Sequence, residues 1–327
     1  MASSLTDTSY QPAFGTGPGL REFIDSAQRD RFLMSFVGGA FESPDWWEPS
    51  VMATVHHRRL MNTHGSRKFA VITGASSGIG YEFAKVCAGE NFEVLVIADQ
   101  GVEEATARLR ADGAAVTGLQ ADLAAYDGNE GVVAAIQQGG RPVDVLALNA
   151  GRLVGGPFLE ADLERDLALI QLNIGSVVHL SKRLLPAMVA RGEGRVLITS
   201  SIAATMPGPY YATYAASKAY LLSFAEAIRY ELKDTGVTVT ALLPGPTDTE
   251  IFDRGGMQNT PVAEGPKDDP TEVAQDAFKA LMAGDDKVVA GSVKNLLQTA
   301  AARVAPEQFM AARHAAQTKP QDLDKKE

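Results

Sequence analysis

Residues 73 to 80 read Thr73-Gly74-Ala75-Ser76-Ser77-Gly78-Ile79-Gly80, and this glycine-rich stretch decides the fold. The apolar run Phe69–Ile72 before it predicts a strand, and the apolar periodicity after it predicts a helix. Glycine suits such a strand-turn-helix junction, because Gly74 permits a tight turn while Gly78 and Gly80 let the backbone approach a pyrophosphate. The free amides and the dipole of the helix N-terminus favour phosphate there. The stretch therefore predicts a dinucleotide site that includes Gly74, Ser76, Ser77, Gly78, Ile79 and Gly80.

Outward from this stretch, short apolar runs alternate with helical segments from Lys68 onward. Most of these runs are continuously apolar, which is typical of strands buried on both faces of a parallel sheet. We therefore expect an α/β fold in a single domain: a doubly wound, seven-stranded parallel sheet of the Rossmann type, with helices on both faces. The predicted strands are Phe69–Ile72, Val94–Ile97, Val116–Leu119, Val145–Leu148, Val196–Thr199, Val237–Leu243 and Val288–Ala290.

The composition divides the chain into three parts. Residues 1–66 are rich in Gly, Ser, Pro and Asp, and we expect a largely irregular N-terminal extension. The adjacent indoles Trp46 and Trp47 favour an alternative, an arm that docks on this subunit or on a neighbour. Residues 67–292 form the predicted catalytic domain, and residues 293–327 a helical segment with a charged tail.

Charge and composition argue against several classes of partner. The 327 residues carry a net charge of −10, whereas nucleic acids and anionic membranes attract clustered Lys and Arg. No apolar run approaches the about 20 residues that span a bilayer, and no signal pattern begins the chain, so we expect a cytoplasmic protein. Cys87 is the single cysteine and the five histidines are scattered, so no metal site is predicted.

Asp99 ends the second predicted strand, nineteen residues beyond Gly80. A carboxylate at this place can accept hydrogen bonds from the ribose hydroxyls of an adenosine, which favours NAD. At about 4 Å it would repel each charge of a 2′-phosphate by about 1 to 4 kcal/mol. The next residue is Gln100, and no Arg or Lys adjoins Asp99 in the sequence. NAD is the favoured cofactor, and NADP stays open.

A catalytic group is indicated by Tyr214 and Lys218, which share one face of a helix at i and i+4. A tyrosine acts as a general acid and base near neutrality only if its ordinary pKa of about 10 is lowered. A nearby ammonium, together with the nicotinamide cation, supplies positive charge for this. Ser201 stands thirteen residues before Tyr214 and can orient a substrate oxygen. Ser200 competes for that role, but the spacing selects Ser201.

These motifs occur in the order TGxxxGxG, Asn149-Ala150-Gly151, Asn173, Ser201 and YxxxK. Over about residues 68–260 the chain resembles the short-chain dehydrogenase/reductase family. The resemblance implies that Tyr214 is the proton donor and acceptor, that Lys218 binds the ribose and tunes the tyrosine, and that Ser201 binds the substrate oxygen. It implies that Asn173 holds a water linking the lysine to solvent, and that subunits form homodimers or homotetramers.

Further residues match cofactor-binding positions of the family. The pair Asp122-Leu123 resembles the residues that flank the adenine, and the segment Pro244 to Thr249 resembles the loop that closes over the nicotinamide. The additional Pro246 should stiffen that loop. By resemblance, the expected cofactor contacts also include Asp122, Leu123, Asn149, Ala150, Gly151, Pro244, Gly245, Thr247 and Thr249.

Together these patterns predict an enzyme that transfers hydride between a nicotinamide and a secondary alcohol or ketone. The segments Arg152–Phe158, Ala203–Tyr211 and Ile251–Gly265 should surround the substrate, and their apolar and aromatic side chains favour a moderately hydrophobic one. A different class, a silent cofactor-binding regulatory or scaffolding protein of the same fold, is the alternative. The presence of both Tyr214 and Lys218 favours the enzyme.

Overall fold

The computed structural model describes residues 67–302 and 306–323. The extension predicted for residues 1–66, with Trp46 and Trp47, lies outside the described residues. The described residues belong to the second of two compact units, which spans Ser66–Glu327.

Seven parallel strands form one sheet in the order β3-β2-β1-β4-β5-β6-β7. The chain winds outward from β1 in one direction and from β4 in the other, so the strand order reverses between these two neighbours. This confirms the predicted doubly wound sheet, and it creates a crevice at the carboxyl ends of β1 and β4. The strands are β1 Phe69–Thr73, β2 Glu93–Ala98, β3 Val116–Gln120, β4 Val145–Leu148, β5 Gly194–Thr199, β6 Val237–Pro244 and β7 Lys287–Ala290.

The burial of the strands explains their uniform hydrophobicity. All residues of β1 and β4 are buried, because each strand has neighbours on both sides and helices on both faces. The edge strand β3 is mostly exposed or half-buried, which matches its weaker sequence signal. Hydrophobicity along each strand therefore reports how central that strand is in the sheet.

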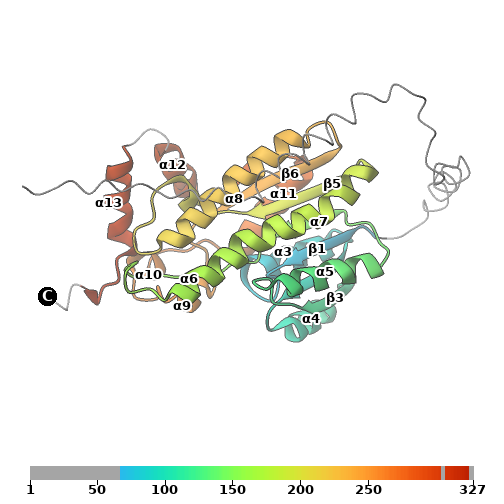
Figure 1. Cartoon of the computed structure of the whole chain (residues 1–327), viewed down its shortest axis with the longest axis horizontal. Helices are drawn as coiled ribbons and strands as arrows, with labels where there is room; N and C mark the ends of the chain where they lie inside the picture. The colour runs from blue at the N-terminus through green and yellow to red at the C-terminus, as the bar shows by residue number, and fades with distance from the viewer. Residues whose placement is uncertain (1–66, 303–305, 324–327) are drawn as a thin grey trace, which may run out of the picture. The chain divides into compact units, whose positions relative to one another are not determined.

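Two apolar clusters fill the layers above and below the sheet. One face packs against α5, α7 and α8, through side chains such as Val132, Leu180 and Leu221. The other face packs against α3, α4 and α11, through Phe83, Leu109 and Ala277. Figure 1 shows the two sets of helices on opposite sides of the sheet. Their bounds are α3 Gly78–Gly89, α4 Val102–Ala111, α5 Tyr126–Gln138, α7 Ser176–Arg191, α8 Ala212–Glu231 and α11 Pro270–Ala283.

The helical segment that contains Asn173 is divided into three parts. Helix α6 spans Leu163–Ile170, a π-helical segment η1 spans Gln171–Gly175, and α7 continues from there. A π segment inserts a residue into the helical repeat and is common at functional sites. Here it lies at the position of Asn173, which is fully buried.

Short helices gather beyond the carboxyl end of the sheet (Figure 1). The last of them, α13, packs against α10, and Gln321 N donates to Asn259 O at 3.0 Å just beyond it. These elements place the C-terminal part of the chain over the edge where the predicted site residues lie. They are η2 Ile202–Thr205, α9 Ile251–Arg254, α10 Pro261–Glu264, α12 Val293–Ala302 and α13 Glu307–Thr318.

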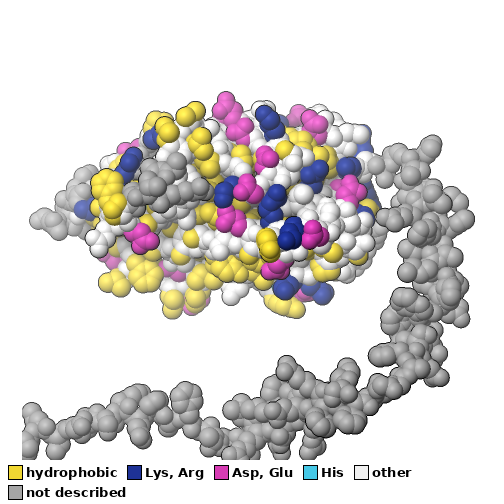
Figure 2. All heavy atoms as spheres, turned by 90° about the horizontal axis from the view of Figure 1, so that it is seen from above, with side chains coloured by type: hydrophobic (Ala, Val, Ile, Leu, Met, Phe, Trp, Pro, Cys, Tyr) yellow, Lys and Arg dark blue, Asp and Glu magenta, His cyan; other side chains and the backbone are white. Residues whose placement is uncertain are grey.

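The surface carries both signs of charge. On the face shown in Figure 2, Lys and Arg side chains lie beside Asp and Glu, with apolar side chains between them. Within residues 67–302 and 306–323, no helix is long and apolar enough to cross a membrane. The same residues hold no group of three or more His, Cys, Asp or Glu that could bind a metal ion.

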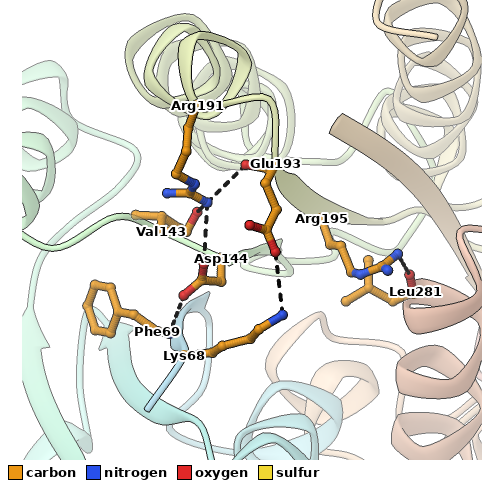
Figure 3. Close-up of polar contacts among 8 residues, drawn as sticks. All are labelled: Lys68, Phe69, Val143, Asp144, Arg191, Glu193, Arg195 and Leu281. Carbon is orange, nitrogen blue, oxygen red and sulfur yellow. Dashed lines mark hydrogen bonds and ion pairs between the residues drawn. The ribbon is translucent and has the colours of Figure 1, made fainter. Parts of the chain in front are cut away.

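The amino edge of the sheet is tied together by Asp144, which precedes β4 (Figure 3). Its Oδ2 accepts from Phe69 N at 2.7 Å, and its Oδ1 lies 3.3 Å from Arg191 Nη2. The same guanidinium donates to Val143 O at 2.7 Å and to Glu193 O at 2.9 Å. One carboxylate thus joins the starts of β1 and β4 to the end of α7.

We expect Asp144→Ala to destabilise the protein without weakening cofactor binding. The substitution leaves the Phe69 amide without its acceptor and removes the carboxylate that pairs with Arg191, at a cost of about 1 to 3 kcal/mol. Urea unfolding measures this cost. The matched control is Glu193→Ala, whose exposed pair with Lys68 at 3.5 Å should contribute little. Equal losses in the two variants would contradict the assignment.

Candidate cofactor and catalytic site

A cavity of about 990 Å³ opens at the carboxyl ends of the strands. It lies at the point where the strand order reverses, the usual ligand crevice of such sheets. Most predicted site residues line it together, whereas Gly80 and Asn173 lie behind the lining. The predicted residues at the wall are Gly74, Ser76, Ser77, Gly78, Ile79, Asp99, Asp122, Leu123, Asn149, Ala150, Gly151, Ser201, Tyr214, Lys218, Pro244, Gly245, Thr247 and Thr249.

The glycine loop has no room for side chains. Gly74 has a φ of +66° and Gly78 a φ of +57°, in the left-handed region that favours glycine. A Cβ on Gly80 would overlap the carbonyl oxygen of Gly74, and one on Gly78 would lie 2.9 Å from Thr249 Cγ2. Helix α3 can therefore start directly against the end of β1.

The N-terminus of α3 is suited to an anion. The helix begins at Gly78. The side chain of Ser77, the residue at the N-cap, makes no capping hydrogen bond, and no acidic residue lies in the first turn. Its first amides are consequently free to donate, and its dipole is not offset by a carboxylate. These features fit the diphosphate of a dinucleotide.

The adenosine end of the cavity combines an acid with an arginine that the sequence did not indicate. Asp99 lies exposed after β2 and at the cavity wall. Arg108, from α4, reaches the glycine loop, where its Nη2 donates to Ser76 O at 3.4 Å and its guanidinium lies 4.5 Å from the centroid of the Tyr81 ring. Eight residues separate Asp99 from Arg108 in the sequence, and no motif connects the two. At the other wall, Asp122 Oδ1 accepts from Ala124 N at 2.9 Å.

Helix α8 carries Tyr214 and Lys218 to the centre of the cavity. Lys218 Nζ donates to Thr199 O at 2.8 Å and lies 5.6 Å from the centroid of the Tyr214 ring. The hydroxyl of Ser201 lies beside Tyr214, where it acts to lower the pKa of the phenol, and it donates to Pro244 O at 3.4 Å. Ser200 instead donates to Lys218 O at 2.7 Å. The serine at the predicted spacing is therefore the one next to the tyrosine.

Burial dominates the ionisation of this pair. It raises the pKa of Tyr214 to about 12, although the hydrogen bond with Ser201 acts in the opposite direction. Burial also lowers the pKa of Lys218 to about 8. At neutral pH the tyrosine is thus a protonated phenol and the lysine remains mostly cationic. The protein's own groups leave the pKa of Tyr214 above its ordinary value, so the lowering that the sequence led us to expect would require further positive charge.

Asn173 organises the loop after β4. Its Nδ2 donates to Arg152 O at 3.0 Å and to Ser217 Oγ at 3.0 Å, and its Oδ1 accepts from Arg152 N at 2.9 Å. The side chain therefore holds Gly151 in place, where an added Cβ would lie 3.4 Å from Lys218 Nζ. The amide bonds protein atoms at both of its ends.

The C-terminal half supplies residues that no motif indicated. Asn295 of α12 packs against Gly245 and donates to Asp268 Oδ2 at 2.6 Å, while Thr247 Oγ1 donates to Gly245 O at 3.0 Å. These bonds fix the loop after β6. The remaining, mostly apolar wall is formed by side chains that include Leu153, Val154, Ala203, Tyr211, Met257 and His314.

Comparisons with known proteins agree with this geometry. The family model described as short chain dehydrogenase matches residues 68–259. A putative ketoacyl reductase from Streptomyces coelicolor is 36% identical over 186 residues, which are 56% of this chain and 71% of that protein. A short-chain dehydrogenase from Sphingobium yanoikuyae, solved with NADPH, is 29% identical with a TM-score of 0.64 over 68% of this chain and 87% of that one. Actinorhodin polyketide ketoreductase with NADPH is 30% identical, with a TM-score of 0.60 over 68% of this chain and 95% of that one.

This chain belongs to the short-chain dehydrogenase family. It is an NAD(P)-dependent oxidoreductase, as the resemblance of its motifs led us to expect.

We expect Gly80→Ala to weaken binding of the reduced cofactor at least about tenfold, because the new methyl group would push α3 away from the glycine loop. Fluorescence titration measures the dissociation constant. Gly89→Ala, at the other end of the same helix, is the control, since a Cβ there meets no atom of the described chain within 4 Å. A Gly80→Ala protein that binds like the control would contradict the packing argument.

Proposed function

We propose that this enzyme transfers hydride between a nicotinamide cofactor and a secondary alcohol or ketone, with Tyr214 as the general acid and base. The observation that carries the proposal is the convergence of Tyr214, Lys218 and Ser201 on one cavity with the glycine loop. A proton-transfer group and an anion-binding helix N-terminus in one crevice suit nicotinamide chemistry.

In this mechanism the cofactor, when bound, supplies or accepts the hydride. The hydroxyls of Ser201 and Tyr214 donate hydrogen bonds to the carbonyl oxygen of the substrate and so polarise it. Tyr214 then transfers its proton to that oxygen, and in the oxidative direction it takes the proton back. Lys218, held by Thr199 O, stabilises the negative charge left on the tyrosine oxygen.

The protonation of the site favours carbonyl reduction near neutral pH. A general acid must carry its proton, and the burial that raises the pKa of Tyr214 to about 12 keeps it there. Oxidation needs the deprotonated form, so it should gain as the pH rises towards the pKa.

The wall of the cavity supports a moderately hydrophobic substrate. Leu153, Val154, Ala203 and Met257 are buried around Tyr214 and form one apolar cluster with it. Such a wall favours apolar carbonyl compounds over sugars. The names of the similar proteins, a ketoacyl reductase and a polyketide ketoreductase, agree with this class.

We propose NAD as the preferred cofactor. The support is Asp99 at the wall, whose negative charge would repel a 2′-phosphate. Two observations favour NADP instead. Arg108 donates to Ser76 O at the glycine loop, and the two similar structures contain NADPH. Asp99 is the group beside the expected ribose, and we give it the greater weight.

We also propose a homodimer or homotetramer that pairs through α6 and α8. These helices expose large apolar side chains: Leu163 is 67% exposed, Leu167 45% and Tyr220 41%. Such a surface is typical of a protein interface. Residues 1–66 and 293–327 are proposed as additions to a catalytic domain of residues 67–292.

Tyr214→Phe should lower turnover at least about a hundredfold, because the proton donor is lost, and should leave the dissociation constant of NADH nearly unchanged. Both NADH and NADPH are screened against ketones, and NAD and NADP against secondary alcohols, steroids and hydroxy acids. Tyr230→Phe is the control, since it removes an exposed phenol hydroxyl from the same helix. Full activity of Tyr214→Phe would refute the mechanism and favour another proton donor. No turnover by the wild type on any compound would favour a silent binding protein.

Asp99→Asn should shift the ratio of NADPH to NADH affinity towards NADPH by about tenfold, because one repulsive charge is removed. Glu103→Gln removes the same charge from the first turn of α4, away from the cavity wall, and serves as the control. Fluorescence titration of both cofactors checks the ratio. An identical shift in the control, or a wild type that prefers NADPH, would contradict the role of Asp99.

A further inference from the structure

Two buried side chains at the cavity wall come from segments far apart in the chain. Tyr211 directly precedes α8, and His314 lies on α13. Helix α13 lies beyond residue 259, where the match to the family model ends. The contact between Tyr211 and His314 is therefore a feature of this chain's C-terminal segment.

The hydrogen bonds define which atom carries each proton. His314 Nδ1 lies 2.9 Å from Pro207 O, and a carbonyl can only accept, so Nδ1 carries the hydrogen. Burial lowers the pKa of His314, which favours the neutral ring with a bare Nε2. Tyr211 Oη lies 2.6 Å from that Nε2 and must donate to it. Burial raises the pKa of Tyr211, so this phenol stays protonated as a donor.

The Tyr211 ring is stacked on the ring of Tyr214. Their centroids are 5.7 Å apart with an interplanar angle of 24°, and the His314 ring stands edge-on to Tyr211 at 5.3 Å. A tyrosine ring has two soft torsions, and a stacked neighbour restricts both. Tyr211 cannot turn without breaking its buried hydrogen bond to His314. That bond therefore fixes the Tyr211 ring, and through the stacking it also restricts the orientation of the Tyr214 ring.

The backbone that bears Tyr211 is held by the same helix. Besides the bond from His314 to Pro207 O, Thr318 Oγ1 donates to Pro209 O at 2.9 Å. Tyr210, between this loop and α8, has a φ of +64°, which is costly for a residue other than glycine. Contacts with α13 thus maintain a loop conformation that the loop alone does not favour.

We propose that His314 and Tyr211 are positioning residues, which hold the Tyr214 ring in the orientation for proton transfer through one buried hydrogen bond. The proposal rests on Tyr214 being the general acid and base. It makes the C-terminal helix α13 part of the catalytic arrangement, although no atom of His314 needs to touch the reacting groups.

Three substitutions separate the two hydrogen bonds of His314. Tyr211→Phe keeps the stacked ring but removes its hydroxyl. His314→Asn can keep the donor to Pro207 O near the place of Nδ1 but loses the acceptor for Tyr211. His314→Gln can place an acceptor near Nε2 and loses the donor. We expect kcat for ketone reduction to fall about tenfold in Tyr211→Phe and His314→Asn, and to stay within about threefold of the wild type in His314→Gln.

The double variant Tyr211→Phe/His314→Asn tests whether the two residues act through the same bond. Its kcat should be no lower than that of either single variant, since the second substitution removes a bond that is already broken. The dissociation constant of NADH should be unchanged in every variant. Thermal unfolding confirms that each protein is folded, and Gln321→Ala is the control, because it loses the exposed bond from Gln321 Nε2 to Glu264 Oε2 just beyond α13 and touches neither residue of the pair.

Wild-type kcat in Tyr211→Phe and His314→Asn, or independent losses that multiply in the double variant, would overturn the proposal. A loss in Gln321→Ala as large as in His314→Asn would also overturn it, because the C-terminal segment would then act only as general support. Tyr214→Phe, measured in parallel, distinguishes a failure of the proposed function from a failure of the positioning role. If that variant retains turnover, the proposed function fails, whatever the other variants do.

Discussion

The side-chain amide of Asn149 connects the two halves of the site, and the other groups depend on it. Its Nδ2 lies 3.2 Å from Thr73 O and 3.3 Å from Gly74 O, at the end of β1. Its Oδ1 accepts from Thr199 Oγ1 at 3.1 Å, at the end of β5, and Thr199 O in turn accepts from Lys218 Nζ. One chain of hydrogen bonds thus runs from the glycine loop to the lysine, so the expected phosphate site and the candidate proton-transfer site cannot move independently.

This connection also explains how a lysine is tolerated among buried groups. Removing an ammonium from water costs several kcal/mol unless it is hydrogen-bonded, and burial lowers the pKa of Lys218 accordingly. The hydrogen bond to the Thr199 carbonyl offsets part of this cost, and the electrostatic attraction to the nearby Tyr214 ring offsets a further part. The position of the charge is consequently fixed by β5 and α8, which both contribute buried side chains to the same apolar layer.

The sequence predicted the sheet and much of the candidate site because both depend on local patterns. Apolar runs such as Val145–Leu148 coincide with observed strands, and the spacing of Ser201, Tyr214 and Lys218 is a property of one loop and one helix. The π segment at Asn173 has no comparable signature, since the periodicity continues through it. Arg108, Asn295 and His314 were not predicted for another reason. Asn295 and His314 reach the cavity, and Arg108 reaches the glycine loop, through tertiary packing, which leaves no fixed spacing in the chain.

The predicted site residues and the unpredicted ones belong to different parts of the cavity. The cofactor side of the cavity is built from strand ends whose positions follow from the sheet, so short motifs identify it. The opposite side is built by α12 and α13, which meet the cavity from beyond the last strand and pack through Asn295 on Gly245 and through His314 on Tyr211. Segments of this kind can change without disturbing the sheet, because they add contacts at its edge and contribute little to its two apolar layers. Substrate preference should therefore depend on the C-terminal segment together with the loops that carry Leu153, Ala203 and Met257, and the redox chemistry on the strand ends.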